Sequence, residues 1–100
     1  MRIISWSVLA AYARSHPETK VPLARWRTLV RASAWRSMDD LRSAAPAVKI
    51  LNGERVRFEI AGGSFRLIAA LDFRRQIVFV KFIGTHAEYD RVDALTVAQF

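Results

Sequence analysis

The sheet of this protein is encoded by residues 54–83, which read ERVRFEIAGGSFRLIAALDFRRQIVFVKFI. Apolar side chains alternate with polar ones in three runs, over residues 54–60, 65–72 and 77–83. A period of two is typical of half-buried strands, and the runs are separated by short segments that join antiparallel neighbours directly. The sequence therefore predicts an antiparallel meander of three strands.

A further strand is expected just before this meander, over residues 48–51. It is separated from the strand at 54–60 by Asn52-Gly53, a dipeptide that is typical of a two-residue hairpin turn. After the last strand, Gly84-Thr85 is expected to open a short C-terminal helix that runs through Tyr89 to Leu95. The second half of the chain contains no proline, so nothing in it interrupts the sheet.

Helices are predicted in the N-terminal half, after a short strand over residues 2–6. The first helix should be capped by Ser7 and stopped by His16-Pro17. The second is expected from residue 19 to about residue 35, because apolar side chains recur there at helical spacing. Its polar side is basic and carries in one row Lys20, Arg27 and Arg31.

A third, short helix is expected from Ser37 to about Ala45, since Ser37 can act as an N-cap and acidic residues follow it. Trp6 and Trp26 fall on apolar helix faces, so we expect them to pack in the core. Together these elements predict an α+β fold in which N-terminal helices pack on a mainly antiparallel C-terminal sheet that is followed by a short helix.

The composition fits a single domain over residues 1–100. With 100 residues and 52% hydrophobic content, two separate cores would each be too small to be stable. The absence of cysteine excludes disulfides and thiolate zinc sites. Although the N-terminus superficially resembles a secretory signal, its apolar stretch is interrupted by serines and too short to span a bilayer, so we expect a cytoplasmic protein that does not bind membranes.

The charge balance points to a polyanionic partner. The chain carries a formal net charge of +7, and most of its basic residues are arginine. Arginine favours planar, bidentate contacts with phosphate, which makes nucleic acid the preferred interpretation. An anionic membrane surface and an acidic protein remain open on charge alone.

Strand pairing predicts where the charges of the sheet lie. If residues 61–64 and 73–76 are four-residue loops, Phe58 pairs with Leu67 and Leu67 with Phe82. A neighbouring apolar row is then formed by Val56, Ala69 and Val80. Both rows should face the helices. The opposite face is predicted to hold one row of Arg57, Ile68 and Lys81, and beside it Glu59, Arg66 and Ile83, with Arg55 one step further.

This opposite face has two interpretations. It is either a solvated surface, on which Glu59 pairs with Arg66 for little net energy, or a binding surface made of Arg55, Arg57, Arg66 and Lys81. Arg66 favours the second, because it lies in an otherwise apolar strand where an unpaired cation is costly and a bound phosphate would compensate it.

Two motifs carry a resemblance to a known family. Residues 58–68 read FEIAGGSFRLI, and residues 85–90, directly after the last strand, read THAEYD. Together they resemble the HigB toxins of the RelE-like toxin–antitoxin superfamily, and the second motif is the more specific. Arg91 stands where that family is expected to have lysine; it keeps the charge but excludes a role in proton transfer.

The resemblance implies a type II toxin that inhibits translation as a ribosome-dependent, metal-independent mRNA endonuclease without a cofactor. It also implies a cognate antitoxin with a helix-turn-helix domain, HigA-like in type. Two other functions stay open: a gyrase-poisoning toxin of the same fold, against which His86 argues, and a non-catalytic RNA-binding module. Codon preference, antitoxin identity and complex stoichiometry also stay open.

Metal-free RNA cleavage needs a proton acceptor for the 2′-hydroxyl, positive charge for the phosphoryl oxygens and a proton donor for the leaving oxygen. The predicted catalytic residues are His86 as acid or base, Arg66 and Lys81 as phosphate ligands, and Tyr89 as a hydrogen-bond donor or stacking partner. His86 can instead be a helix cap, and Tyr89 can simply anchor the last helix. The predicted RNA contacts are Arg55, Arg57, Arg74, Arg75 and Arg91, and no cluster suggests a metal site.

Overall fold

The computed structural model describes all 100 residues and contains five strands and four α-helices. In chain order these are β1 (Arg2–Ile4), α1 (Trp6–Ser15), α2 (Lys20–Arg31), α3 (Met38–Ala44), β2 (Lys49–Ile50), β3 (Arg55–Ile60), β4 (Phe65–Asp72), β5 (Ile77–Thr85) and α4 (His86–Tyr89). Two 3₁₀ turns lie at Pro17–Thr19 and Ala61–Gly63. No helix combines the length and apolarity that crossing a bilayer would require.

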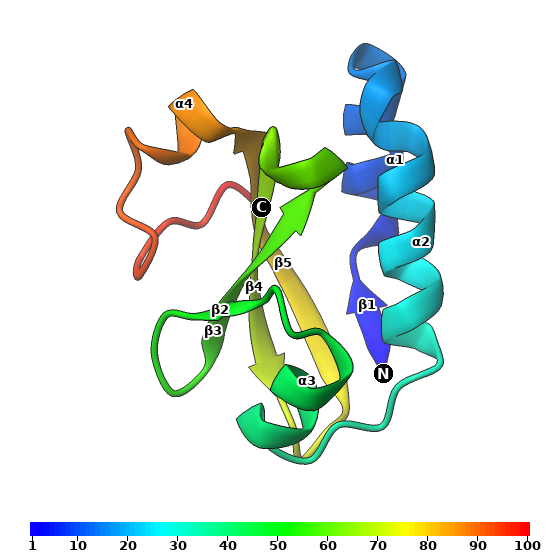
Figure 1. Cartoon of the computed structure of the whole chain (residues 1–100), viewed down its shortest axis with the longest axis vertical. Coiled ribbons are helices and arrows are strands. Elements are labelled where there is room, and N and C mark those ends of the chain that lie inside the picture. Colours follow the sequence, from blue (N-terminus) through cyan, green and yellow to red (C-terminus); the bar gives the residue numbers. More distant parts are fainter.

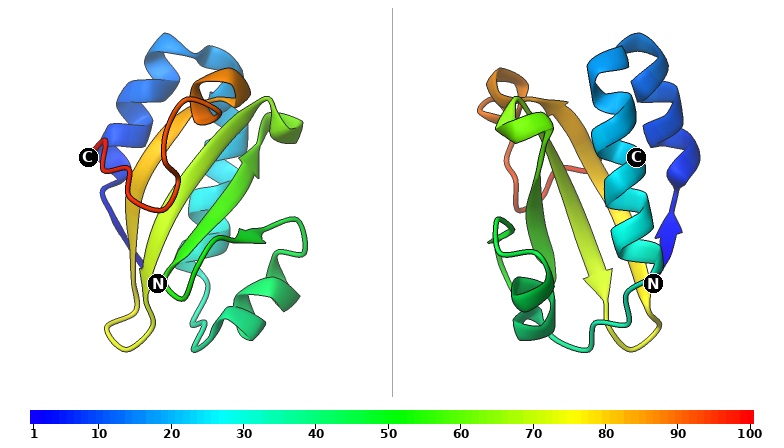
Figure 2. Two further views of the ribbon diagram at one scale, coloured as in Figure 1. Left: turned by 90° about the vertical axis from the view of Figure 1, so that its left-hand side faces the viewer. Right: turned by 45° about the vertical axis from the view of Figure 1, so that its right-hand side comes forward.

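The strands form one sheet in the order β1-β5-β4-β3-β2. All neighbours are antiparallel except β1, which pairs with β5 in parallel. Helices α1 and α2, here called the helical layer, lie together against one face of the sheet (Figure 1). The opposite face carries α4 and the C-terminal segment (Figure 2). The predicted α+β fold is therefore confirmed.

The core lies between the helical layer and the sheet. Leu9 of α1 and Leu23, Trp26 and Val30 of α2 are buried against it, and Trp26 meets the ring of Phe58 edge to face. The sheet contributes Val56, Phe58, Ile60, Phe65, Leu67, Ala69, Leu71, Val78, Val80 and Ile83. Trp6 is only partly buried at the margin of this core, so the prediction of core packing holds fully for Trp26 alone.

The helix boundaries differ from the predicted ones in two places. The N-cap of α1 is Ser5 rather than Ser7, and neither serine caps a backbone N–H because their hydroxyls bond to each other at 2.6 Å. The second helix ends at Arg31, because the N-terminal ammonium of Met1 donates a hydrogen bond to the carbonyl of Val30 at 2.9 Å. Ser37 caps α3 as predicted, accepting the backbone N–H of Asp40 at 3.2 Å.

The predicted two-residue hairpin at Asn52-Gly53 is wrong. The backbone N–H of Leu51 donates to the carbonyl of Arg55, so the turn contains three residues. Its cause is the Asn52 side chain, whose Oδ1 accepts the N–H groups of Glu54 at 2.9 Å and Arg55 at 2.7 Å. An asparagine side chain can hold a turn in this way in place of a backbone bond.

The predicted register is right between β3 and β4 and partly wrong between β4 and β5. Val56, Ala69 and Val80 form one row, and Phe58 pairs with Leu67, as expected. Leu67, however, pairs with Ile83 instead of Phe82, because a β-bulge at Ile68/Ala69 leaves Lys81 without a partner. The same bulge corrects two other predicted pairs: Ile68 faces Phe82 rather than Lys81, and Arg66 faces Gly84 rather than Ile83.

The predicted C-terminal helix is shorter than expected and ends at Tyr89. Thr85 and Glu88 form a capping box at its start, in which each side chain accepts the other's backbone N–H. The chain then turns back to β5, where the N–H of Gln99 donates to the carbonyl of Lys81 at 2.9 Å. The side-chain Oε1 of Gln99 accepts the N–H of Ile83 at 2.9 Å. These bonds to the strand replace those that a longer helix would have made.

Candidate active site

Two arginines converge on one glutamate on the face of the sheet opposite the helical layer. Glu59 Oε1 accepts Arg57 Nε at 2.9 Å and lies 2.8 Å from Arg57 Nη2. Glu59 Oε2 lies 3.3 Å from Arg66 Nε across the β3–β4 pair. The three side chains are between 15% and 23% exposed, so they are shielded but reachable from solvent.

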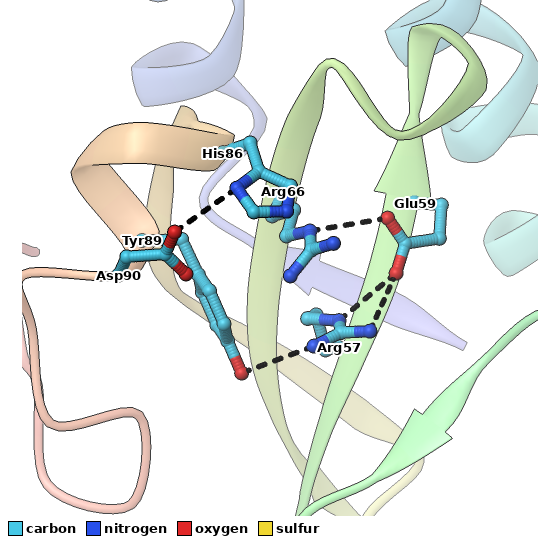
Figure 3. Close-up of polar contacts among 6 residues, drawn as sticks. All are labelled: Arg57, Glu59, Arg66, His86, Tyr89 and Asp90. Carbon is cyan, nitrogen blue, oxygen red and sulfur yellow. Dashed lines mark hydrogen bonds and ion pairs between the residues drawn. The ribbon is translucent and has the colours of Figure 1, made fainter.

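Tyr89 of α4 completes this group, which we call the arginine cluster: Arg57, Glu59, Arg66 and Tyr89 (Figure 3). Arg57 Nη1 donates to the Tyr89 hydroxyl oxygen at 3.3 Å. The guanidinium carbons of Arg57 and Arg66 each lie 5.1 Å from the centre of the tyrosine ring, within cation–π range. The bulge supports the arrangement, since it turns Phe82 to this face, where its ring lies 6.5 Å from that of Tyr89.

The strand opposite Arg66 leaves no room for a side chain. Gly84 pairs with Arg66, and a Cβ atom built on Gly84 would lie 2.6 Å from Cζ of Phe82 and 3.2 Å from Cβ of Glu88. The sequence suggested only that Gly84 ends a strand. Its close packing instead lets Phe82 and α4 approach the arginine cluster.

The electrostatics of the cluster favour the charged form of Arg57. Burial lowers the pKa of Arg57, but the hydrogen bond to Tyr89 and the charge of Glu59 more than offset this and hold it above its usual value. Arg66 differs from Arg57, because its Nε is buried and has no hydrogen-bond partner. Its approach to Glu59 is an ion pair without hydrogen-bond geometry.

His86 lies at the first position of α4 and is 54% exposed. Its backbone N–H donates to the carbonyl of Ser64 at 3.0 Å, which ties α4 to the turn before β4. Its Nδ1 lies 3.1 Å from Oδ2 of Asp90, so Nε2 is the nitrogen left for another partner (Figure 3). No hydrogen bond or ion pair joins it to Arg57 or Arg66.

The four residues predicted to build the basic face do not form one cluster. Arg55 is only 9% exposed, and its Nη1 donates to the carbonyls of Ala94 at 3.2 Å and Val97 at 2.7 Å. It therefore holds the C-terminal segment in place. Lys81 is the bulged residue, and its Nζ lies 5.6 Å from the centre of the Phe79 ring, outside the hydrogen-bond network of the cluster. The structure brings together only Arg57 and Arg66.

The remaining predicted RNA contacts are distributed over two ends of the sheet. Arg74 and Arg75 lie in the β4–β5 turn, and α4 follows the far end of β5, about 26 Å away at 3.3 Å per residue. Arg75 pairs with Asp72 at 2.7 Å, and hydrogen bonds from Arg75 lower the pKa of that carboxyl. Arg91 is exposed just after α4.

Sequence reasoning missed the organising role of Glu59, which appeared only as a surface partner of Arg66. The signal was present, since Glu59 lies two residues from Arg57 on one strand and directly opposite Arg66 on the next. A single carboxylate between two cations offsets their repulsion and lets them lie close together. It also leaves the cluster with one net positive charge when Tyr89 is neutral.

Comparison with known proteins agrees with this geometry. Residues 19–92 match the family model of HigB_toxin, described as the RelE-like toxic component of a toxin-antitoxin system. The chain belongs to this family. The matched range contains the whole arginine cluster and His86, together with β2 to β5. The resemblance to HigB toxins found in the two sequence motifs is therefore confirmed.

Individual relatives cover nearly the whole chain. An mRNA interferase HigB of Escherichia coli O6:H1 (strain CFT073) is 30% identical over 95 residues, covering 92% of this chain and 91% of the relative. The mRNA interferase toxin HigB of Escherichia coli (strain K12) is 25% identical over 93 residues, or 90% and 88% of the two chains. The same values hold for mRNA interferase HigB of Shigella flexneri. These names favour RNA cleavage over gyrase poisoning.

Proposed function

We propose that this HigB-family chain is an mRNA interferase that cuts ribosome-bound mRNA at the arginine cluster. The observation that carries the proposal is Arg66: its Nε is buried on the open face of the sheet and lacks a hydrogen-bond partner. Buried N–H groups without partners are uncommon in folded proteins, and a catalytic role or a bound anion is one explanation for them. A phosphoryl oxygen of the substrate would supply it here.

The two guanidiniums fit the charge that develops during RNA cleavage. As the 2′-oxygen attacks phosphorus, negative charge grows on the non-bridging oxygens, and preformed cations stabilise it without reorganising. Glu59 aligns Arg57 and Arg66 before substrate arrives. Neither arginine can move a proton, because the guanidinium stays charged at all accessible pH values.

Proton transfer therefore falls to Tyr89 and His86. The Tyr89 oxygen accepts a hydrogen bond from Arg57, so its own O–H proton is free to point at the substrate. In the reaction the 2′-hydroxyl loses its proton and forms a bond to phosphorus, while the P–O5′ bond breaks and the 5′-oxygen gains a proton. We assign the donor role to Tyr89 and the acceptor role to neutral His86 through Nε2.

The other predicted contacts follow the path of a longer RNA. Arg91 lies beside α4, and Lys81 borders the cluster along β5. Arg74 and Arg75 contact the phosphodiester backbone of the RNA at the far end of the sheet. Arg55 acts indirectly by fixing the C-terminal segment. An antitoxin, of the helix-turn-helix HigA-like type, neutralises the toxin in the cytoplasm.

Cleavage mapping tests this function. Purified chain is mixed with 70S ribosomes stalled on a defined mRNA, and RNA 5′ ends are mapped by primer extension with and without ribosomes. Wild-type protein should generate new 5′ ends in the mRNA only when ribosomes are present, and Arg66→Ala should generate none. Arg42→Ala, at an exposed position on α3, is the matched control. Intact mRNA together with breaks in gyrase-treated plasmid would contradict the proposal.

A further inference from the structure

Most of the net charge lies in the helical layer rather than at the arginine cluster. Residues 1–32 hold six basic residues and one acidic residue, Glu18, whereas the remaining residues hold ten basic and eight acidic ones. The helical layer and α4 lie on opposite faces of the sheet (Figure 2). Most of the excess positive charge therefore lies on the face of the sheet opposite the candidate active site.

None of these six cations is neutralised within the chain. Its five ion pairs involve neither Arg2, Arg14 nor any basic residue of α2. Helix α2 contains no acidic residue, and Arg27 and Arg31 are four positions apart on it. Like charges at this spacing destabilise a helix. A bound anion would offset the repulsion between Arg27 and Arg31.

A hollow at one end of this row has the features of an anion site. It has a volume of about 250 Å³ and is lined by Arg2, Ile3, Trp6, Arg27 and Arg31. The Arg27 guanidinium lies 4.7 Å above the Trp6 ring, which fixes its plane. Its Nε is buried and has no hydrogen-bond partner, the same condition found for Arg66. A second hollow beside it is lined by Arg27, Thr28, Arg31 and Ala32.

We infer that Arg2, Lys20, Arg27 and Arg31, the basic helical surface, form a second RNA site that binds the phosphodiester backbone of structured RNA independently of cleavage. An arginine whose plane is fixed by an aromatic ring can make bidentate hydrogen bonds to a phosphate group. The basic residues follow one another along α2, so they can contact successive phosphates of one RNA strand. A protein partner is disfavoured at this hollow, because stable protein interfaces have an apolar core, whereas three of its five lining residues are arginine and Arg27 lies over the Trp6 ring.

This inference adds to the proposed function, since an enzyme with two RNA surfaces on opposite faces can hold folded RNA with one and mRNA with the other. The probe is a fluorescein-labelled 24-base-pair RNA duplex carrying 2′-O-methyl groups, which removes the nucleophile. Binding is followed by fluorescence anisotropy between 50 and 200 mM salt. The variants are Arg2→Gln/Arg27→Gln/Arg31→Gln and, with Arg27 and its packing intact, Arg2→Gln/Arg31→Gln.

The triple variant should bind the duplex at least about tenfold more weakly, and the slope of log affinity against log salt should decrease by about three, and by about two for the double variant. Arg36→Gln/Arg42→Gln/Lys49→Gln, which removes the same charge elsewhere, should change the slope by less than about one. Equal losses in the two triple variants would overturn the inference, and so would unchanged slopes. Polyglutamate is the second probe, standing for an acidic protein; if the triple variant lost binding to polyglutamate but not to the duplex, the RNA site would be rejected.

The assay is independent of the proposed catalysis. It uses neither ribosomes nor cleavage. Its result is therefore valid even if the chain does not cut mRNA. Arg66→Ala should retain most of the wild-type salt dependence for the duplex while losing cleavage. A slope that falls as far for Arg66→Ala as for the triple variant would place the backbone contacts at the arginine cluster and reject the second site.

Discussion

The hydroxyl of Tyr89 accepts a hydrogen bond from Nη1 of Arg57, although 32 residues separate them in the chain. The bond joins α4 to β3 across the open face of the sheet, and the ring of the same tyrosine lies against both guanidiniums. A group that is oriented by an arginine yet keeps its own proton is suited to protonate a leaving oxygen.

Replacing Tyr89 by phenylalanine separates this chemistry from packing. Tyr89→Phe keeps the ring beside Phe82 and should lower the single-turnover rate of mRNA cleavage by about 10²- to 10³-fold, because a positioned proton donor contributes about that much. Thermal unfolding should change little. Tyr89→Ala, which also removes the ring, should lower both the cleavage rate and the unfolding temperature. A Tyr89→Phe cleavage rate within about threefold of wild type would exclude the donor role.

Glu59 is predicted to hold the two arginines in register. Glu59→Gln removes the charge between them, so Arg57 and Arg66 should repel each other and the unfolding free energy should decrease by about 1–3 kcal/mol. A double-mutant cycle with Arg57→Met measures the coupling of the pair. We expect about 1–3 kcal/mol from urea unfolding, and additive single effects would show that the ion pair contributes nothing.

Arg55 is predicted to act on the C-terminal segment and not on RNA directly. Arg55→Met removes two hydrogen bonds to the carbonyls of Ala94 and Val97 and should cost about 2–3 kcal/mol of unfolding free energy. Hydrogen exchange at the amides of Ile83 and Gln99 should accelerate, because both depend on the docked segment. Arg36→Met, at an exposed position, is the control and should leave these amides protected.

Tyr12 provides a pH dependence of stability. Burial, and then the charges of Glu88 and Glu18, raise its pKa from 10.0 to about 12. Since the folded state holds the proton more tightly, this contribution is complete below pH 10 and is lost as pH rises through 12. The unfolding free energy should therefore fall more steeply above pH 10 for wild type than for Tyr12→Phe; parallel curves would contradict the shifted pKa.

The elements whose signals are local could be predicted from the sequence. Loop lengths at 61–64 and 73–76 were right, because each loop is a short polar or glycine-containing segment between two largely apolar runs. Ser37 was right as a helix cap. Pairing of Glu59 with Arg66 followed from the same alternation, and this placed the two halves of the site together.

The elements that depend on contacts between distant parts of the chain could not be predicted from the sequence. Phe82 and Ile83 are both apolar, so alternation cannot tell which one faces the core, and the bulge at Lys81 decides it. The path of the C-terminal segment after α4 depends on Arg55, which bonds to Ala94 and Val97, 39 and 42 residues later in the chain. The basic row of α2 was predicted, but the stacking of Arg27 on Trp6 beside it was not, because these residues lie on different helices.

The central claim is that the guanidinium of Arg66 stabilises the transition state of mRNA cleavage. Its most direct test is the single-turnover cleavage rate of ribosome-bound mRNA by Arg66→Ala and Arg66→Lys, both checked for wild-type unfolding. The account predicts a decrease of about 10²- to 10³-fold for alanine and only partial recovery with lysine, which lacks the planar fork. A folded Arg66→Ala protein that cuts at the wild-type rate would contradict it.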